Sequence, residues 1–364
     1  MKDKLTFSAS LLLTLFSALA STAGASTTWY VNGANGSDRN NCLSAATACQ
    51  TIGNAISKAV STDSIRIAPA VYSENLAINI SLKLIGSNAR TTIIDGAKSR
   101  RVISILSTSA AVTLSNLTIR NGIAIAGGGI YNSGNLTLLN SAITGNYALS
   151  GSSATGGGIY NNGTLTVRNS TFSGNTTTAS VVNGVAYGGA IYSTGPLVIN
   201  NSTVSENSVG GRFADGGGIY TAGGARVSNT TIAGNSGNSG SGIYKGGGTV
   251  TIQNSIVAGS SPGRNCFGTM TSNGYNLSSD LTCIFHNSGD RNNTNPRLGT
   301  LGNYGGQTNT MQLLTGSPAI DTGNPSGCKD SQGKLLKTDQ RGMPRPDKED
   351  TVGCDMGAFE RQSD

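Results

Sequence analysis

The chain has 364 residues, of which 52 are glycine, 12% are charged and 5% are aromatic. This composition disfavours a globule around one bulky core and favours a fold stabilised by many small repeated contacts. The net charge of +7 is unevenly placed, because nine Lys and Arg face only two acids between Ala97 and Ser279. That excess indicates either a solvated basic face or an anionic partner; we expect no nucleic-acid partner.

The first 25 residues have the pattern of a secretory signal peptide. Lys2 and Lys4 precede an apolar run at 11–20, and small residues at 23–25 form a cleavage site before Ser26. The run is about half as long as the roughly 20 residues of a membrane span, so we predict no transmembrane segment in the mature chain. The sequence thus predicts an exported protein, secreted or at a bacterial cell surface, with the periplasm as an alternative.

Residues 26–100 are predicted to form an N-terminal cap and the first coils of a solenoid. Ile52, Ala55, Ile56 and Ala59 have the spacing of a short amphipathic helix, which suits the end of a solenoid. Short strands are expected to follow as far as residue 94.

Residues 101–260 contain a repeat that begins with GGGIY, GGAIY or GSGIY and occurs five times. A constant block of 20 residues is followed by joints of 9, 12, 8 and 4 residues, which is typical of a solenoid whose insertions emerge on one side. Alternating apolar residues, with Gly and Asn between them, give three short strands per block. We therefore predict an all-β fold, a right-handed parallel β-helix with three-strand coils.

Two columns of side chains follow from this geometry. Successive strand residues point to opposite faces, so if the repeated Ile is inside, the Tyr beside it is outside. The candidate ligand-binding ladder is Tyr131, Tyr160, Tyr192, Tyr220 and Tyr244, with Arg168 and Arg226 as nearby basic residues. Such a ladder is expected to offer a flat strip on which sugar rings pack through their apolar faces, and the alternative is that the stacked tyrosines only stabilise neighbouring coils. The predicted structural ladder is Asn116, Asn140, Asn169, Asn201, Asn229 and Asn254. The glycines before each Ile-Tyr pair are expected to leave an open strip of backbone.

Residues 261–364 lose the repeat and are predicted to form a loop-rich C-terminal cap. Six cysteines in an exported chain favour disulfides, with fifteen possible pairings. We favour Cys42–Cys49, Cys266–Cys283 and Cys328–Cys354, because each pair is close in sequence and outside the repeats. The charged residues near the C-terminus, Asp321, Asp339, Arg341, Asp355 and Glu360, are expected to form salt links within this cap.

Residues suited to catalysis are few. Glu206 and Asp215 are the weak candidates for a carboxylate pair, but neither has an acidic partner in an adjoining coil. The repeats lack the carboxylates of a Ca²⁺ site, and the single histidine disfavours a triad or a histidine-rich metal site. We predict no metal and no cofactor.

Three segments resemble known families. The stretch WYVNGANGSDRNNC, with TIGNAISKA and SIRIAPAVYSENL, looks like the opening of pectate-lyase-like β-helix proteins, and the GG[GA]IY repeats resemble those of polymorphic outer-membrane proteins. The segment LGTLGNYGGQTNTMQLLTGSPAIDTG, with TDQRGMPRP and CDMGAFE, closely resembles choice-of-anchor Q domain proteins, which are exported bacterial β-helices.

These resemblances and the Tyr column lead to two functional hypotheses. The first is a non-catalytic adhesion or glycan-binding protein whose partner is an extracellular polysaccharide or a cell-surface glycan. The alternative is a polysaccharide lyase or glycoside hydrolase that acts on an acidic polysaccharide.

Overall fold

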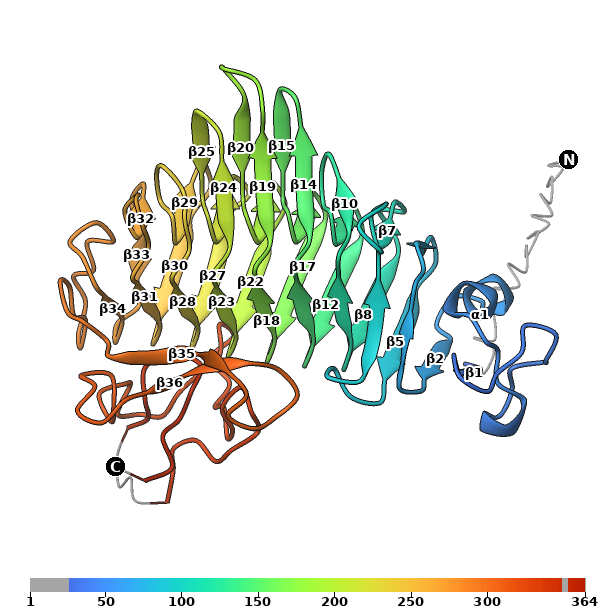
Figure 1. The fold of residues 1–364 in the computed structure, drawn as a ribbon. Helices are drawn as coiled ribbons and strands as arrows, with labels where there is room; N and C mark the ends of the chain where they lie inside the picture. Colours follow the sequence, from blue (N-terminus) through green and yellow to red (C-terminus); the bar gives the residue numbers. More distant parts are fainter. Residues whose placement is uncertain (1–25, 349–352, 364) are drawn as a thin grey trace, which may run out of the picture.

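The computed structural model describes residues 26–348 and 353–363 and shows a right-handed parallel β-helix (Figure 1). The predicted fold is therefore confirmed, whereas the predicted signal peptide lies outside the described residues. Each complete coil contributes one strand to each of three parallel sheets, A, B and C. None of the helices in the described ranges is long and apolar enough to cross a membrane.

Sheet A has ten strands and runs the length of the solenoid. Its members are β1 (Thr28–Val31), β2 (Ser64–Ile67), β5 (Leu82–Gly86), β8 (Ala111–Ser115), β12 (Asn135–Leu139), β17 (Thr164–Arg168), β22 (Leu197–Asn200), β27 (Ala225–Ser228), β30 (Val250–Gln253) and β33 (Thr271–Ser272). Sheet A continues across residues 100 and 260, where we placed domain limits, and those limits stay predictions.

Sheets B and C complete the three-sided coil. Sheet B consists of β3 (Ala70–Tyr72), β6 (Thr92–Asp95), β9 (Thr118–Arg120), β13 (Ala142–Thr144), β18 (Thr171–Ser173), β23 (Thr203–Ser205), β28 (Thr231–Ala233), β31 (Ile256–Ala258) and β34 (Leu277–Ser278). Sheet C consists of β4 (Leu76–Ala77), β7 (Ile103–Ile105), β11 (Ile130–Asn132), β16 (Ile159–Asn161), β21 (Ile191–Ser193), β26 (Ile219–Thr221), β29 (Ile243–Lys245) and β32 (Cys266–Phe267).

The core consists of columns of like residues in register. Ile130 pairs with Ile159, and this column continues through Ile191, Ile219 and Ile243, all fully buried. Adjacent coils are about 4.8 Å apart, so each side chain packs on its counterparts above and below. The repeated Ile therefore forms the core on the sheet C side, as predicted.

The connecting segments form two further sheets that the sequence did not predict. One consists of β10 (Ile123–Ala124), β14 (Tyr147–Ser150), β19 (Thr176–Ala179) and β24 (Ser208–Gly210), and the other of β15 (Ser153–Thr155), β20 (Val185–Tyr187) and β25 (Phe213–Asp215). They project from the solenoid as a fin, seen at the top of Figure 1. A small cluster of Ala179, Ala186, Val209 and Ala214 is buried in the fin.

The N-terminal end is closed by the predicted helix. A 3-10 turn η1 (Ala45–Thr47) precedes α1 (Ile52–Lys58), in which Ile52 and Ala55 are fully buried. Thr51 caps the helix by accepting a hydrogen bond from the Asn54 amide. The helix therefore covers the first coil.

All three predicted disulfides are present: Cys42–Cys49, Cys266–Cys283 and Cys328–Cys354. The first lies beside α1, and the second joins β32 to the loop beyond the last coil. Disulfides form and persist in oxidising compartments.

The C-terminal region extends well beyond the final coil. We call residues 295–348 and 353–363 the C-terminal strap; it includes the antiparallel pair β35 (Leu298–Gly302) and β36 (Thr310–Leu313). The strap lies beneath the strands of the solenoid in Figure 1. At one end Arg90 donates to Asn303 at 2.7 Å, and at the other the Gly357 amide donates to Asn254 at 2.9 Å. The strap thus runs along the side of the solenoid.

Two buried ion pairs stabilise the strap. Arg341 lies 2.7 Å from Asp339, and the Arg345 Nε donates to Glu360 Oε2 at 2.7 Å with both side chains fully buried. Arg345 also donates to Asn201 of the solenoid at 3.1 Å. The salt links expected for Asp339, Arg341 and Glu360 are therefore present, with Arg345 as an additional member.

We predict that the strap makes stability depend on pH through Asp355. Burial and the adjacent Glu360 carboxylate raise the pKa of Asp355 to about 7. An unfolded Asp has a pKa of about 4, so this group's stabilising contribution is complete below that pH and is lost as pH rises through about 7. The melting temperature is expected to fall between pH 5 and pH 8.

Replacing Asp355 with asparagine should remove most of that fall. Asp280→Asn is the matched control, because hydrogen bonds from Asn265, Thr282 and Ser278 outweigh burial and lower the pKa of Asp280. In the control variant the melting temperature should still fall between pH 5 and pH 8, whatever the absolute stability of that variant. A decline that persists unchanged in Asp355→Asn would show that another group is responsible.

Candidate functional site

The predicted tyrosines form one continuous stack on the outer side of sheet C. Their ring centroids are 4.8 to 5.3 Å apart, and Phe267 extends the stack at 4.4 Å from Tyr244. We call this set the aromatic strip; its members are Tyr131, Tyr160, Tyr192, Tyr220, Tyr244 and Phe267. The strip crosses six adjacent strands of sheet C.

The orientation of the rings agrees with the expected stacking between coils and differs from a flat platform for sugar rings. Neighbouring planes in the strip are inclined by only 6 to 21°, so each ring faces the next ring along the solenoid. The ring faces, which the sequence led us to expect as an open platform, are covered by their neighbours. A ligand therefore meets ring edges and phenol groups.

Sequence reasoning missed Phe267 and also two residues that contact the strip. Arg101 lies over the Tyr131 ring at 4.9 Å and donates to the Gly127 and Ala126 carbonyls. Tyr187, on β20 of the fin, stacks on Tyr220 at 4.7 Å. Tyr187 lies outside the repeated pentapeptide, in a connecting segment of variable length, so no repeat marked it.

The glycines of the pentapeptide pack closely where the fin returns to sheet C. Gly156 has φ +65°, which favours glycine, and a Cβ on Gly157 would lie 2.4 Å from the Thr176 carbonyl oxygen. Both residues are buried. The expected open strip of backbone is therefore wrong, because the glycines permit close packing between fin and coil.

An acidic residue, Asp215 at the end of β25, lies beside the strip. Asp215 pairs in register with Tyr187, and burial raises the pKa of its carboxyl. Burial also raises the pKa of Tyr220 to about 12, with smaller contributions from the neighbouring tyrosines and Asp215. The Tyr220 phenol thus stays protonated at physiological pH and can donate a hydrogen bond.

The other predicted site residues are not gathered at the strip. Arg168 and Arg226 belong to β17 and β27 of sheet A, a different face of the coil, and Arg168 is paired with Asp330 at 2.9 Å. Glu206 is an exposed residue with φ +60° that precedes β24, and no hydrogen bond joins it to Asp215 among the described residues. The two carboxylates show no direct interaction.

The predicted asparagine column occupies the turn between sheets A and B. All six residues have positive φ, from 47 to 55°. Their amides bond in separate pairs, Asn140 to Asn116, Asn201 to Asn169 and Asn254 to Asn229. The ladder is therefore interrupted, and the shared feature is the left-handed turn, which Asn tolerates.

A second, continuous asparagine ladder was missed. Asn146, Asn175 and Asn207 each donate from Nδ2 to the Oδ1 of the next member, ending at Asn235, over 2.9 to 3.0 Å. The members are buried. Each is the last residue of its 20-residue block, so the repeat alignment contained the pattern.

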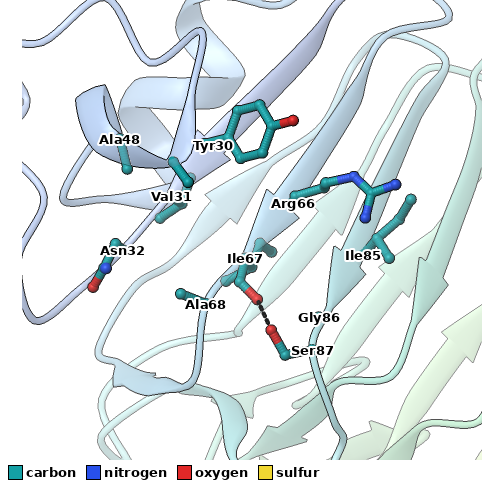
Figure 2. Close-up of a pocket in the computed structure, with 11 residues that line it drawn as sticks. Tyr30, Val31, Asn32, Ala48, Arg66, Ile67, Ala68, Ile85, Gly86 and Ser87 are labelled. Carbon is teal, nitrogen blue, oxygen red and sulfur yellow. Dashed lines mark hydrogen bonds between the residues drawn. The ribbon is translucent and has the colours of Figure 1, made fainter.

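A hollow of about 210 Å³ lies on sheet A near the N-terminal end (Figure 2). Tyr30 and Arg66 line it from adjacent strands, with Ile85 on the next. Ser87, at its edge, donates to the Ile67 carbonyl at 3.1 Å. Arg66 is exposed, and its guanidinium has no hydrogen bond or ion pair within the described ranges. Nowhere in those ranges do three or more His, Cys, Asp or Glu form a group that could hold a metal ion.

Comparisons with known proteins support the fold. The family model described as a right-handed beta helix region matches residues 101–289, more than half of the chain. The crystal structure of pectate lyase Pel9A is similar over 93% of this chain and 98% of its own, with a TM-score of 0.52 and 16% sequence identity. At that identity the similarity concerns the fold alone. A search of curated proteins gives no significant match.

Proposed function

Because the chain belongs to the right-handed β-helix family, we propose that it is an exported, non-catalytic protein that binds a polysaccharide along the aromatic strip. The observation that carries this proposal is the strip itself, six stacked rings in register along the solenoid. Its repeat along one axis suits a polymer with a repeating unit. A surface of this kind serves adhesion to a glycan.

The chemistry of the strip favours a neutral polysaccharide. Arg168 and Arg226, which suggested an acidic ligand, lie on sheet A. The charged groups around the strip are mixed, since Arg101 covers one ring and Asp215 lies beside another. Protonated phenols donate to sugar hydroxyls, and tyrosine combines an apolar body with this polar tip.

Export is supported by the N-terminal sequence and by the three disulfides, which are typical of oxidising compartments. The resemblance of the C-terminal segment to choice-of-anchor Q domain proteins, and of the repeats to polymorphic outer-membrane proteins, supports a place at the cell surface.

Replacing Tyr160, Tyr192 and Tyr220 with phenylalanine is expected to weaken polysaccharide binding about tenfold or more. The rings would still stack, but three hydroxyl groups would be lost, each worth about 0.5–1.5 kcal/mol in a neutral hydrogen bond. A glycan array first identifies the ligand, and titration calorimetry then compares the variant with the unchanged protein.

Tyr30→Phe is the matched control, because Tyr30 lies on sheet A. It should leave binding unchanged, and all variants should melt as the unchanged protein does. If the triple variant binds normally, the phenols do not contact the ligand. If it melts much lower, the tyrosines serve the fold.

A second candidate function is polysaccharide cleavage, and Asp215 is the observation that favours it. A carboxyl group with a raised pKa can act as a general acid, and the fold is similar to that of a pectate lyase. Assays for reducing ends and for unsaturated products should be run on each polysaccharide that binds. If the unchanged protein forms product and Asp215→Asn forms none, the protein is an enzyme. Binding without product would support adhesion.

A further inference from the structure

The outer face of sheet A carries charge of one sign. The charged residues within its ten described strands are Arg66, Lys83, Arg168 and Arg226, with no Asp or Glu among them. A face of this kind attracts anionic polymers. Since Arg168 is paired with Asp330, the cations that stay available are the other three.

Arg226 lies between two adjoining hollows on this face. One, of about 360 Å³, extends over β22 and the turn that contains Gly223 and Gly224, and the other, of about 330 Å³, extends over β30 towards Ser331 and Gln332. Arg226 and Thr251 line both hollows. Arg226 is thus shared by the two halves of one elongated depression.

The second hollow is lined by polar groups that lack protein partners. Gln253 and Asn273 come from the solenoid and Gln332 from the C-terminal strap. Within the described ranges, their side-chain amides form no hydrogen bonds, and neither do the Thr251 hydroxyl and the Arg226 guanidinium. These amide, hydroxyl and guanidinium groups together match the hydroxyl and carboxylate groups of an acidic sugar.

Arg168 positions one wall of this depression. Its guanidinium donates to Asp330, whose other oxygen accepts from the Gln332 and Lys334 amides at 2.9 and 3.0 Å. The Ser331 amide in the same turn donates to Asn200 of β22 at 3.0 Å. Although burial opposes it, these hydrogen bonds hold the pKa of Asp330 below its usual range. The turn that carries Gln332 is therefore fixed over sheet A.

The fold itself does not require arginine at position 226. Along the same register column, Arg226 is followed by Thr251 and Thr271, and two coils earlier stands Thr166. A short hydroxyl side chain thus satisfies the sheet at this position, and the arginine is a departure from the repeat.

We propose that this depression is a binding site for an acidic saccharide, with Arg226 binding a sugar carboxylate and the surrounding amides binding sugar hydroxyls. The choice of a saccharide rests on the proposed function, but the site lies on another sheet from the aromatic strip. The two sites can therefore be tested separately.

The test is calorimetric titration of the full chain with an oligoglucuronate, beside the same oligomer as its neutral methyl ester. Arg226→Thr, which introduces the residue of neighbouring coils, should weaken binding of the acid about tenfold or more, because a charge-assisted hydrogen-bonded pair is lost. Lys83→Thr is the control. It removes the same charge from the same column five strands away, about 24 Å at the usual strand spacing, and should leave binding within about twofold.

The neutral methyl ester should bind weakly to the unchanged protein. Its affinity should be no higher than the affinity of the acid for Arg226→Thr. Equal binding of acid and ester, equal losses in the two variants, or no binding of the acid by the unchanged protein would each overturn the site. The triple phenylalanine variant of the aromatic strip should bind the acid normally. Loss of acid binding in that variant would instead place the acidic ligand on the aromatic strip.

Discussion

Replacing Asn207 with alanine is expected to destabilise the solenoid by about 3 kcal/mol or more. The Asn207 amide donates to the Phe172 carbonyl and to Asn235, while its oxygen accepts from the amide and the side chain of Asn175. Every one of these groups is buried, and each one left without a partner costs about 1–3 kcal/mol. The melting temperature and the urea midpoint of the variant measure the loss.

Asn140→Gly is the control for this prediction. Asn140 has φ +49°, which glycine adopts readily, and its single side-chain hydrogen bond to Asn116 is only partly buried. The Asn140→Gly variant should therefore lose less than about 1 kcal/mol of unfolding free energy. If both variants lost the same stability, the buried ladder would contribute no more than the turn column.

The second large effect is expected for Arg345→Met. The substitution removes the guanidinium that lies 2.7 Å from the fully buried Glu360 carboxylate, and breaking a buried ion pair typically costs about 3–5 kcal/mol. The strap should loosen first. Hydrogen exchange should accelerate at the Ala358 amide, which bonds to Thr231 of the solenoid, while the Asn175 amide in the buried ladder stays protected.

The double variant Arg345→Met, Glu360→Gln separates charge burial from lost contacts. With both charges gone, position 360 no longer carries a buried charge that has lost its ion pair, so a substantial part of the lost stability should return. A double variant as unstable as the single one would show that packing and the hydrogen bond to Asn201 account for the loss. Acceleration of the ladder amides together with the strap amides would mean that the two parts unfold as one unit.

The repeated coil was predictable because each of its constraints is local and recurs. Ile159 and Tyr160 alternate in the same way as Ile191 and Tyr192, and a column that recurs at one strand spacing must stack on itself. The disulfides were predictable because close cysteine pairs lie at the ends, where no repeat supplies packing.

The fin escaped prediction because its strands lie in connecting segments whose length differs from coil to coil. Thr177 of β19 pairs with Val209 of β24 across segments of different length. The fin core of Ala179, Ala186 and Ala214 is too small to give a hydrophobic pattern. The contact of Tyr187 with the aromatic strip could therefore not be predicted from the sequence.

The strap was beyond sequence reasoning because its contacts join distant and unrelated residues. Thr203 donates to Gln340 at 2.7 Å across 137 positions, and neither residue has a charge that marks the pair. For the same reason Arg168 looked like a free cation. Its partner Asp330 is 162 positions away.

The strap also fixes the number of coils. Solenoids ordinarily lengthen or shorten by duplication or deletion of a repeat, since each coil contacts only its neighbours. Here one more coil between Arg90 and Asn254 would move Arg90 by about 4.8 Å from Asn303 and Asn309, which breaks both hydrogen bonds while the Asn254 end stays in place. The chain therefore contains its own molecular ruler, and a change in repeat number requires a matching change in the strap.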